Sequence, residues 1–438
     1  MLKVISASLV ALLMGILGQE PVELDQLELL SWEKAEIFVL PTEPEPAVEK
    51  IVQDYLKGLK AKGLVTKRQG VWIQSDWNEF AQNQGKVPGS AASLTKMATT
   101  LAVLAKWSPD YQFETRIYST GLVKDGVLQG DLLVEGSSDP FFVWEEAIAL
   151  GNTLNRLGIR KVTGNLVITG KFYLNYKSNP KVAGQRLKQG LNARLWSPVV
   201  TRAYRTLAPD LPRPQVAIAG TVVLKDNIPD SANLILRHQS LTVAEILKQM
   251  NIYSNNDLSE MLAQSVGGAK VVAQMAAKAA KVPQGEIQLI NGSGLGVNNR
   301  ISPRAACGIL MAIERRLKSK SLNLADFFPV AGRDFQGTML NRNIPSGVVL
   351  KTGTLNQVSA LAGVIPTRDR GSVWFAIINY GNGIEYFRAQ QDQLLQRLSQ
   401  HWELTPISTT ATNVHKGKLG DSSRNLSAEK FWIEDERG

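Results

Sequence analysis

A serine and a lysine stand three residues apart where a polar stretch of the chain gives way to an apolar one. In "PGSAASLTKMATT", residues 88–100, they are Ser93 and Lys96. At this spacing two side chains project from the same face of a helix, so the hydroxyl and the amine would lie side by side. The first turn of a helix has free backbone N–H groups, which favour negative charge developing on Ser93.

Nucleophilic chemistry at this pair requires an uncharged lysine. A serine hydroxyl is a poor nucleophile unless a neighbouring base takes its proton, and only a neutral Lys96 can be that base. Burial and a second nearby cation both lower a lysine pKa in this direction. The alternative is that Ser93 only caps the helix while Lys96 is exposed to solvent, and the spacing alone does not decide between the two.

Two further stretches carry groups of the same kind. In "YSNN", Ser254 and Asn256 fall between two helices, where they could relay a proton and hold a substrate amide. An ordinary helix–helix turn would use the same residue types.

The other stretch is "LKTGTL", which extends an apolar strand into Lys351, Thr352, Gly353 and Thr354. Gly353 lacks a side chain where another backbone or a ligand must approach closely. Lys351 adds a fixed cation, and the threonine hydroxyls suit a carboxylate. A charged edge strand, which protects a sheet from aggregation, is the alternative interpretation.

Together the three stretches, in the order Ser-x-x-Lys, Ser-x-Asn and Lys-Thr-Gly, form the signature of penicillin-recognising serine acyltransferases. Each falls in the secondary structure that the chemistry needs. The first lies in a strongly predicted helix at 91–107. The second separates helices whose capping boxes are Thr242 with Glu245 and Asp257 with Glu260. The third opens an antiparallel meander of three late strands.

Longer stretches of the chain resemble the D-alanyl-D-alanine carboxypeptidase/endopeptidase family of low-molecular-mass, class C penicillin-binding proteins. The most specific are "LINGSGLGVNNRISP", "FPVAGRDFQGTMLNR" and "LKTGTLNQVSALAGVIP", and the resemblance covers roughly residues 85–385. It implies an α/β (α+β) fold, in which a transpeptidase/β-lactamase-like domain has an antiparallel sheet flanked by helices. A β-rich insertion interrupts that domain.

The resemblance also implies roles for the residues of the first two motifs. Ser93 would be the acylated nucleophile and Lys96 its general base. Ser254 would pass the proton to the leaving D-Ala nitrogen, and Asn256 would orient the acyl amide.

At the third motif the resemblance implies a binding site for the terminal carboxylate of the substrate. Lys351 would help to keep Lys96 neutral and would attract that carboxylate, which the hydroxyls of Thr352 and Thr354 would bind beside Gly353. The backbone N–H groups of Ser93 and Thr354 would form the oxyanion hole.

Composition restricts the other functions that the chain could have. The net charge of +10 favours anionic partners, but no basic run contains interleaved aromatic residues, so nucleic acid is not expected. The one cysteine excludes an internal disulfide, and the three histidines are far apart, so neither a metal nor another cofactor is predicted. The family resemblance implies that the partners are peptidoglycan peptides and, as covalent inhibitors, β-lactams.

The N-terminus predicts export to the periplasm or the cell envelope. A lysine, an apolar run and a polar exit indicate a signal peptide, or an uncleaved anchor that would associate with the membrane. The predicted organisation is a signal peptide or anchor at 1–18, a linker at 19–46, a first catalytic-domain segment at 47–110, a β-rich insertion at 111–236, a second catalytic-domain segment at 237–402 and a disordered tail at 403–438.

The sequence therefore predicts a penicillin-sensitive, serine-type D-Ala-D-Ala carboxypeptidase or D,D-endopeptidase that acts through an acyl-enzyme. Two alternatives stay open. A serine β-lactamase would share the fold and the motifs but would need a dedicated deacylating water. A non-catalytic peptidoglycan-binding protein would have kept the cleft and lost turnover.

Overall fold

The late meander provides three strands of a five-stranded antiparallel sheet. The computed structural model describes residues 45–405 and 417–428. In it the strand order is β15-β16-β17-β1-β2, so the strand with the Lys-Thr-Gly motif lies at an edge. The strands are β1 (Gly70–Gln74), β2 (Glu79–Asn83), β15 (Val349–Leu355), β16 (Val358–Thr367) and β17 (Gly371–Tyr380).

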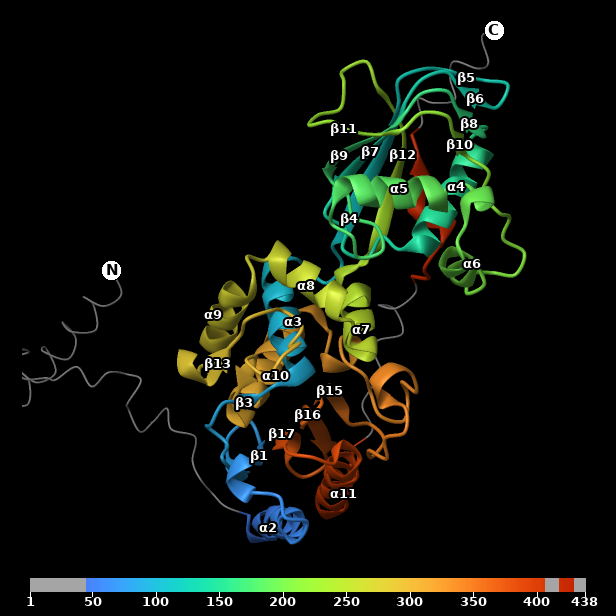
Figure 1. The fold of residues 1–438 in the computed structure, drawn as a ribbon. Coiled ribbons are helices and arrows are strands. Elements are labelled where there is room, and N and C mark those ends of the chain that lie inside the picture. The colour runs from blue at the N-terminus through green and yellow to red at the C-terminus, as the bar shows by residue number, and fades with distance from the viewer. Residues whose placement is uncertain (1–44, 406–416, 429–438) are drawn as a thin grey trace, which may run out of the picture.

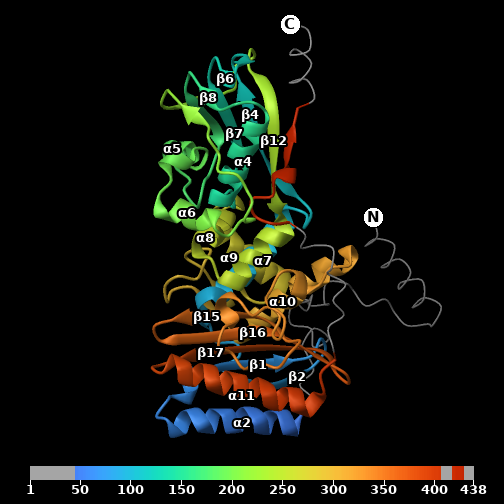
Figure 2. The same ribbon diagram turned by 90° about the vertical axis from the view of Figure 1, so that its right-hand side faces the viewer.

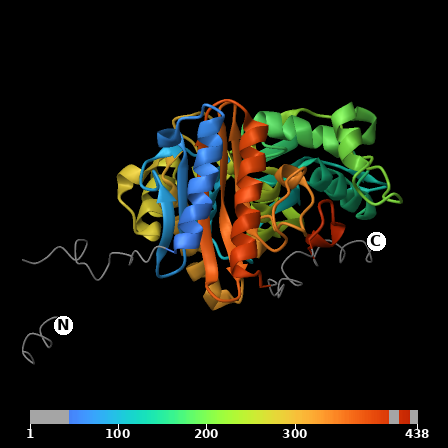
Figure 3. The same ribbon diagram turned by 90° about the horizontal axis from the view of Figure 1, so that it is seen from below.

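Both faces of this sheet are covered, which explains why β16 and β17 are buried along nearly their whole length rather than at alternate positions. Helices α2 (Pro46–Ala61) and α11 (Ile384–Trp402) lie side by side on one face (Figure 3). Neighbouring residues of β15 pack into different hydrophobic cores. Leu350 packs in the core between the sheet and helices α2 and α11, and Val349 packs in the core on the opposite side of the sheet.

The opposite face packs against a layer of helices around α3 (Thr95–Lys106) and α10 (Pro303–Leu317) (Figure 1). The layer also contains α7 (Val243–Tyr253), α8 (Asn256–Ser265) and α9 (Ala269–Ala280), with a small sheet of β3 (Gly89–Ser90), β13 (Ile287–Gln288) and β14 (Arg300–Ile301).

The two predicted helix caps have different outcomes. The capping box of Thr242 and Glu245 at the start of α7 is confirmed. The predicted box of Asp257 and Glu260 is wrong, because Asn255 caps α8 by accepting a hydrogen bond from the Leu258 N–H. An Asn side chain is a strong N-cap, and its use here leaves the Glu260 carboxylate for another partner.

The insertion stands above the helical layer and has its own core (Figures 1 and 2). Helices α4 (Trp144–Arg156), α5 (Pro180–Gly190) and α6 (Pro198–Tyr204) accompany two sheets. One sheet has the order β11-β9-β7-β4-β12-β18 and the other β10-β8-β6-β5. These strands are β4 (Gln112–Ser119), β5 (Val123–Lys124), β6 (Val127–Leu128), β7 (Leu132–Ser137), β8 (Lys161–Val162), β9 (Leu166–Lys171), β10 (Ala217–Ile218), β11 (Val222–Leu224), β12 (Asn233–Thr242) and β18 (Asn425–Ser427).

The predicted boundary between 236 and 237 needs a correction. Strand β12 runs through it without a break and pairs with β4 up to Thr242, so the insertion sheet continues to the residue before α7. The β-prone residues before "LTVAEILKQM" therefore belong to the insertion rather than to the second segment of the catalytic domain.

The prediction of disorder over 403–438 is wrong for residues 417–428. Strand β18 pairs antiparallel with β12, and the guanidinium of Arg424 donates a 2.5 Å hydrogen bond to the buried carboxylate of Glu146. Asn425 also contacts the buried ring of His238 at 2.7 Å. Polar residues typical of a disordered tail thus find buried partners in the insertion.

The predicted signal peptide or anchor at 1–18 and almost all of the linker at 19–46 lie outside the described residues. Within 45–405 and 417–428 no helix is long and apolar enough to cross a bilayer.

Candidate active site

Ser93 lies in a tight turn at the start of α3. It belongs to the 3₁₀ turn η4 (Ala92–Leu94), and α3 itself begins at Thr95. The preceding Ala92 has a left-handed φ of 46°. A Cβ at Gly294 would lie only 1.8 Å from the Ala92 carbonyl oxygen, so only a glycine permits this close contact between the turn and the "NGSGL" loop.

Lys96 is fully buried, and its amine has three polar neighbours. Its Nζ lies 3.0 Å from Ser93 Oγ, 2.8 Å from Asn256 Oδ1 and 2.8 Å from the carbonyl oxygen of Ser293. Burial lowers the pKa of Lys96 to about 7, against the opposing effect of the Glu260 carboxylate. The alternative of a solvent-exposed lysine is therefore wrong.

The three neighbours of Lys96 match what a neutral amine can bind. Such an amine has two N–H donors and one lone pair. Two of its neighbours, Asn256 Oδ1 and the Ser293 carbonyl, are acceptors only. When both donors are used there, the lone pair is left for the Ser93 hydroxyl proton.

The second motif is both a helix–helix turn and part of the site. Ser254 ends α7 in a left-handed conformation with φ 52°, and Asn255 caps α8. Ser254 Oγ lies 3.1 Å from Lys351 Nζ, and Asn256, the first residue of α8, contacts Lys96. The turn thus places two side chains toward the two lysines.

Lys351 is as buried as Lys96, and its Nζ also donates a 2.9 Å hydrogen bond to the carbonyl of Thr352. Burial and the positive charge of Lys96 hold the pKa of Lys351 well below its usual range. The charge of Lys96 thus disfavours the charged form of Lys351, whereas the pKa of Lys96 itself is lowered by burial.

Gly353 lies against the turn that contains Ser93. A Cβ at this position would be 3.0 Å from the backbone nitrogen of Ser93 and 2.9 Å from the carbonyl oxygen of Ala91. The close backbone approach expected from the glycine is thus present. Of its neighbours, Thr352 is buried and Thr354 is exposed.

Sequence reasoning missed the carboxylate that fixes the "NGSGL" loop. Glu260 accepts 2.9 Å hydrogen bonds from the backbone N–H groups of Gly292 and Ser293. The hydroxyls of Thr99 and Ser259 each donate a 2.8 Å hydrogen bond to the Gly292 carbonyl. The Ser293 carbonyl is thereby held in place beside Lys96.

Arg388 on α11 is a second residue that the sequence did not indicate. Its Nη2 donates a 3.1 Å hydrogen bond to Thr354 Oγ1, and its Nη1 forms a 2.7 Å ion pair with the exposed Glu385. An arginine remains charged at any ordinary pH. It therefore adds a permanent cation next to the third motif.

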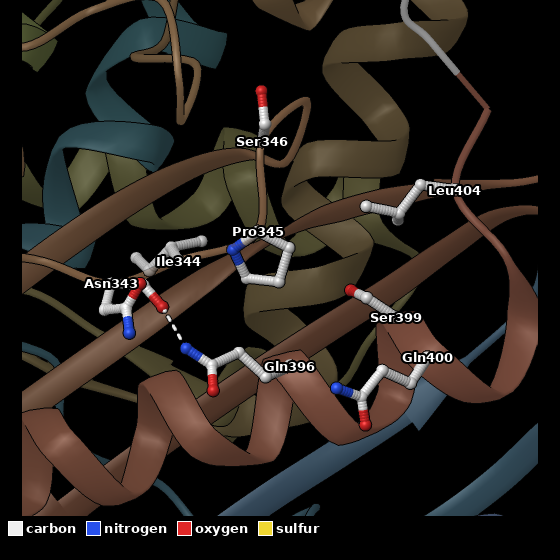
Figure 4. Close-up of a pocket in the computed structure, with 8 residues that line it drawn as sticks. All are labelled: Asn343, Ile344, Pro345, Ser346, Gln396, Ser399, Gln400 and Leu404. Carbon is white, nitrogen blue, oxygen red and sulfur yellow. Dashed lines mark hydrogen bonds between the residues drawn. The ribbon is translucent and has the colours of Figure 1, made fainter.

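A shallow pocket elsewhere on the domain is unrelated to these motifs. It lies between α11 and residues 343–346, where Gln396 donates a 2.7 Å hydrogen bond to the Asn343 carbonyl (Figure 4). None of its lining residues belongs to the three motifs.

The fold and the site define a penicillin-binding, active-site-serine peptidase. A buried lysine with a lowered pKa contacts a serine at the start of a helix, and an inter-helix serine and an edge-strand lysine lie beside them. The family model of the D-Ala-D-Ala carboxypeptidase 3 (S13) family matches residues 59–183 and 175–401. The chain belongs to this family, which confirms the predicted family, fold class and class of enzyme.

Curated relatives and solved structures agree with this assignment. The chain is 22% identical over 442 residues to D-alanyl-D-alanine carboxypeptidase DacB of Haemophilus influenzae, covering 79% of this chain and 90% of the relative. It is 24% identical over 368 residues to carboxypeptidase DacB of Mycolicibacterium smegmatis, covering 73% and 77%.

Among solved structures, the penicillin G-acylated Bd3459 predatory endopeptidase of Bdellovibrio bacteriovorus shares the fold with a TM-score of 0.66. The two chains are 22% identical, and the match covers 82% of this chain and 99% of that one. Penicillin-binding protein 4 of Haemophilus influenzae matches with a TM-score of 0.57 at 20% identity, covering 79% and 98%.

Proposed function

We propose that the protein hydrolyses the D-Ala–D-Ala bond of peptidoglycan stem peptides through an acyl-enzyme on Ser93, and that β-lactams acylate the same hydroxyl. The observation that carries the proposal is the environment of Lys96. Two carbonyl-type acceptors occupy the N–H groups of its neutral form, and its lone pair is left for Ser93.

Acylation begins when Lys96 takes the proton of Ser93 and Oγ attacks the carbonyl carbon of the penultimate D-Ala. The backbone N–H groups of Ser93 and Thr354 stabilise the oxyanion, and losing one such donor typically costs about 10²–10³ in rate. Ser254, 3.1 Å from Lys351, donates its hydroxyl proton to the leaving nitrogen. It receives in its place the proton that Lys96 took from Ser93, so that Lys96 is neutral again. The C–N bond breaks and the terminal D-Ala leaves as a free amine.

Deacylation repeats these steps with water as the nucleophile. Lys96 takes a proton from the water, whose oxygen attacks the acyl carbon. The C–O bond to Ser93 then breaks, and the proton returns to Oγ. The products are a shortened stem peptide and an enzyme ready for another cycle, or two separated peptides when the bond cut is a D,D cross-link.

The terminal carboxylate of the substrate binds beside β15, at the hydroxyls of Thr352 and Thr354. Because both lysines are driven towards their neutral forms, they contribute little permanent charge there. Arg388, which contacts Thr354, supplies that charge. It raises affinity for the carboxylate without taking part in proton transfer.

We also propose that the protein acts outside the cytoplasmic membrane, in the periplasm or cell envelope, where its substrate lies. Residues 1–18 would direct export and, if they are retained, would associate the protein with the membrane.

Mass spectrometry after incubation with labelled penicillin tests this function. A single covalent adduct on the peptide that contains Ser93, absent from Ser93→Ala, is the expected result. An adduct on another serine would show that the nucleophile is wrongly assigned. Rapid turnover of nitrocefin without a lasting adduct would identify a β-lactamase instead, and release of D-Ala from a pentapeptide distinguishes the peptidase from a non-catalytic binding protein.

A further inference from the structure

The insertion carries a layer of cations that the proposed chemistry does not use. The segment from Lys177 to Arg205 contains seven basic residues and no acidic one. It forms α5, the 3₁₀ turn η5 (Ala193–Leu195) and α6, which lie on one side of the insertion (Figures 1 and 2). We call it the α5–α6 basic layer. Its basic residues are Lys177, Lys181, Arg186, Lys188, Arg194, Arg202 and Arg205.

Two of the seven have a structural role. The half-buried Arg186 donates a 3.0 Å hydrogen bond to the Asn175 carbonyl, and its guanidinium lies 5.7 Å from the ring centroid of Trp144. The half-buried Lys188 donates a 2.6 Å hydrogen bond to the Gly220 carbonyl. These two contacts hold α5 to the rest of the insertion.

The other five basic residues are exposed, and no contact within the fold explains why they are basic. Within the described part of the chain, their side-chain nitrogens make no ion pair and no hydrogen bond; they are Lys177, Lys181, Arg194, Arg202 and Arg205. Lys181 even stands at the second position of α5, where the helix dipole disfavours a cation. Because like charges repel, concentrating them here raises the free energy of the folded state.

The layer is connected to the active site through the loop that precedes α5. Burial raises the pKa of Tyr176 in this loop to about 12, although a hydrogen bond with Asn255 acts in the opposite direction. Asn255 lies between Ser254 and Asn256 of the second motif. In Figure 2, α5 and α6 lie toward the same side of the molecule as α8, which begins at Asn256.

We propose that the α5–α6 basic layer binds carboxylates of peptidoglycan stem peptides that neighbour the one being cleaved. This rests on the proposed function, because only then is peptidoglycan the polymer at the active site. A wall polymer presents many carboxylate-bearing peptides at once. Several exposed lysines and arginines can each make a weak charge-assisted contact with it, and linked weak contacts add up to useful affinity.

An acidic membrane is the competing partner, and the layer is poorly suited to it. Its exposed apolar side chains are Val182, Leu195 and Val199, and no exposed large aromatic residue accompanies them. Helices that lie in a membrane surface usually insert Trp, Phe and Leu along one apolar face. Helix α6 has only seven residues, which leaves little room for such a face.

Co-sedimentation of the full chain with purified peptidoglycan tests the proposal. Ser93→Ala serves as the background, so that the substrate is not consumed during the measurement. In this background we compare a layer variant, with Arg194, Arg202 and Arg205 changed to Glu, with a matched control. The control changes three exposed lysines at the opposite end of the molecule, Lys50, Lys60 and Lys67, to Glu.

We expect the layer variant to bind about tenfold more weakly than the background, because each exposed charge contact is worth about a two- to fivefold factor in affinity. The control should bind within about twofold of the background. Added salt should weaken binding of the background and the control much more than that of the layer variant.

Equal binding by the layer variant and the control would overturn the proposal. So would binding to vesicles that contain phosphatidylglycerol with no binding to peptidoglycan. To check that the layer variant folds, Ser93 is restored in it and covalent labelling by penicillin is measured. A second, milder variant has Gln in place of Glu at the same three positions. Pentapeptide hydrolysis by the unmutated protein is measured separately, so that loss of the proposed function is distinguishable from loss of the binding layer.

Discussion

The carboxylate of Glu260 accepts a 2.9 Å hydrogen bond from the backbone N–H of Ser293, so that the carbonyl of Ser293 faces Lys96. Glu260 also opposes the lowering of the Lys96 pKa, because its negative charge favours the ammonium form. One side chain therefore has two effects on Lys96, the proposed general base: it positions a hydrogen-bond acceptor, and it limits how far the pKa falls.

Replacing Glu260 by Gln changes both effects, and each is read from a different feature of the pH profile of acylation: the midpoint and the maximum. Loss of the negative charge lowers the pKa of Lys96, so the pH at which penicillin acylation reaches half of its maximum should move to a lower value. The maximum itself should fall by about tenfold, since the Gln amide cannot accept from both backbone N–H groups. The measurement is the acylation rate constant as a function of pH.

Asp257→Asn is the matched control, since Asp257 is an exposed acid on the same helix. Its profile should coincide with that of the unmutated protein. An unchanged profile in Glu260→Gln would show that Glu260 does not act on Lys96.

Gly353→Ala tests the close approach between β15 and the turn that contains Ser93. The added Cβ would lie 3.0 Å from the Ser93 backbone nitrogen, so either the strand or the turn must move. A displaced oxyanion donor should lower the acylation rate by about 10²-fold or more. Gly285→Ala is the control, because a Cβ there meets no atom within 4 Å. Acylation of Gly353→Ala at the unmutated rate would contradict this placement of the oxyanion hole.

Arg388→Ala should weaken substrate binding rather than chemistry. Removing the permanent cation beside Thr354 is expected to raise KM for a pentapeptide by about tenfold, as for a lost hydrogen bond to a charged group, with kcat changing much less. Arg388→Lys should restore part of the affinity. Arg397→Ala removes an arginine of the same helix that pairs with Asp54, and it should leave KM unchanged. A lower kcat with normal KM in Arg388→Ala would contradict the assignment.

The motif residues could be predicted from the sequence because each motif fixes its own local geometry. Ser93 and Lys96 are three positions apart, a spacing that places them on one face of a helix. A turn between two capped helices presents Ser254 and Asn256. A strand places Lys351 and Gly353 on one face. Local spacing does not show that these three elements lie close together in space. That expectation came from the family resemblance.

Glu260, Ser293 and Arg388 could not be found in this way. Ser293 acts through a backbone carbonyl, which carries no signal of residue type. Glu260 has the spacing of a capping box with Asp257, and only the structure shows that Asn255 takes the cap. Arg388 meets Thr354 from a helix 34 residues further along the chain. Such contacts are set by packing and not by local pattern.

The charge state of Lys96 is the central claim, and nuclear magnetic resonance of lysines labelled with ¹³C at Cε measures it most directly. Comparison with Lys96→Met assigns the signal. We predict that this signal titrates with a midpoint near pH 7, where burial places the pKa, and that the penicillin acylation rate rises with pH over the same range because only the neutral amine is a base. A Lys96 signal that stays fully protonated up to pH 9, with acylation already fast at pH 7, would contradict the account.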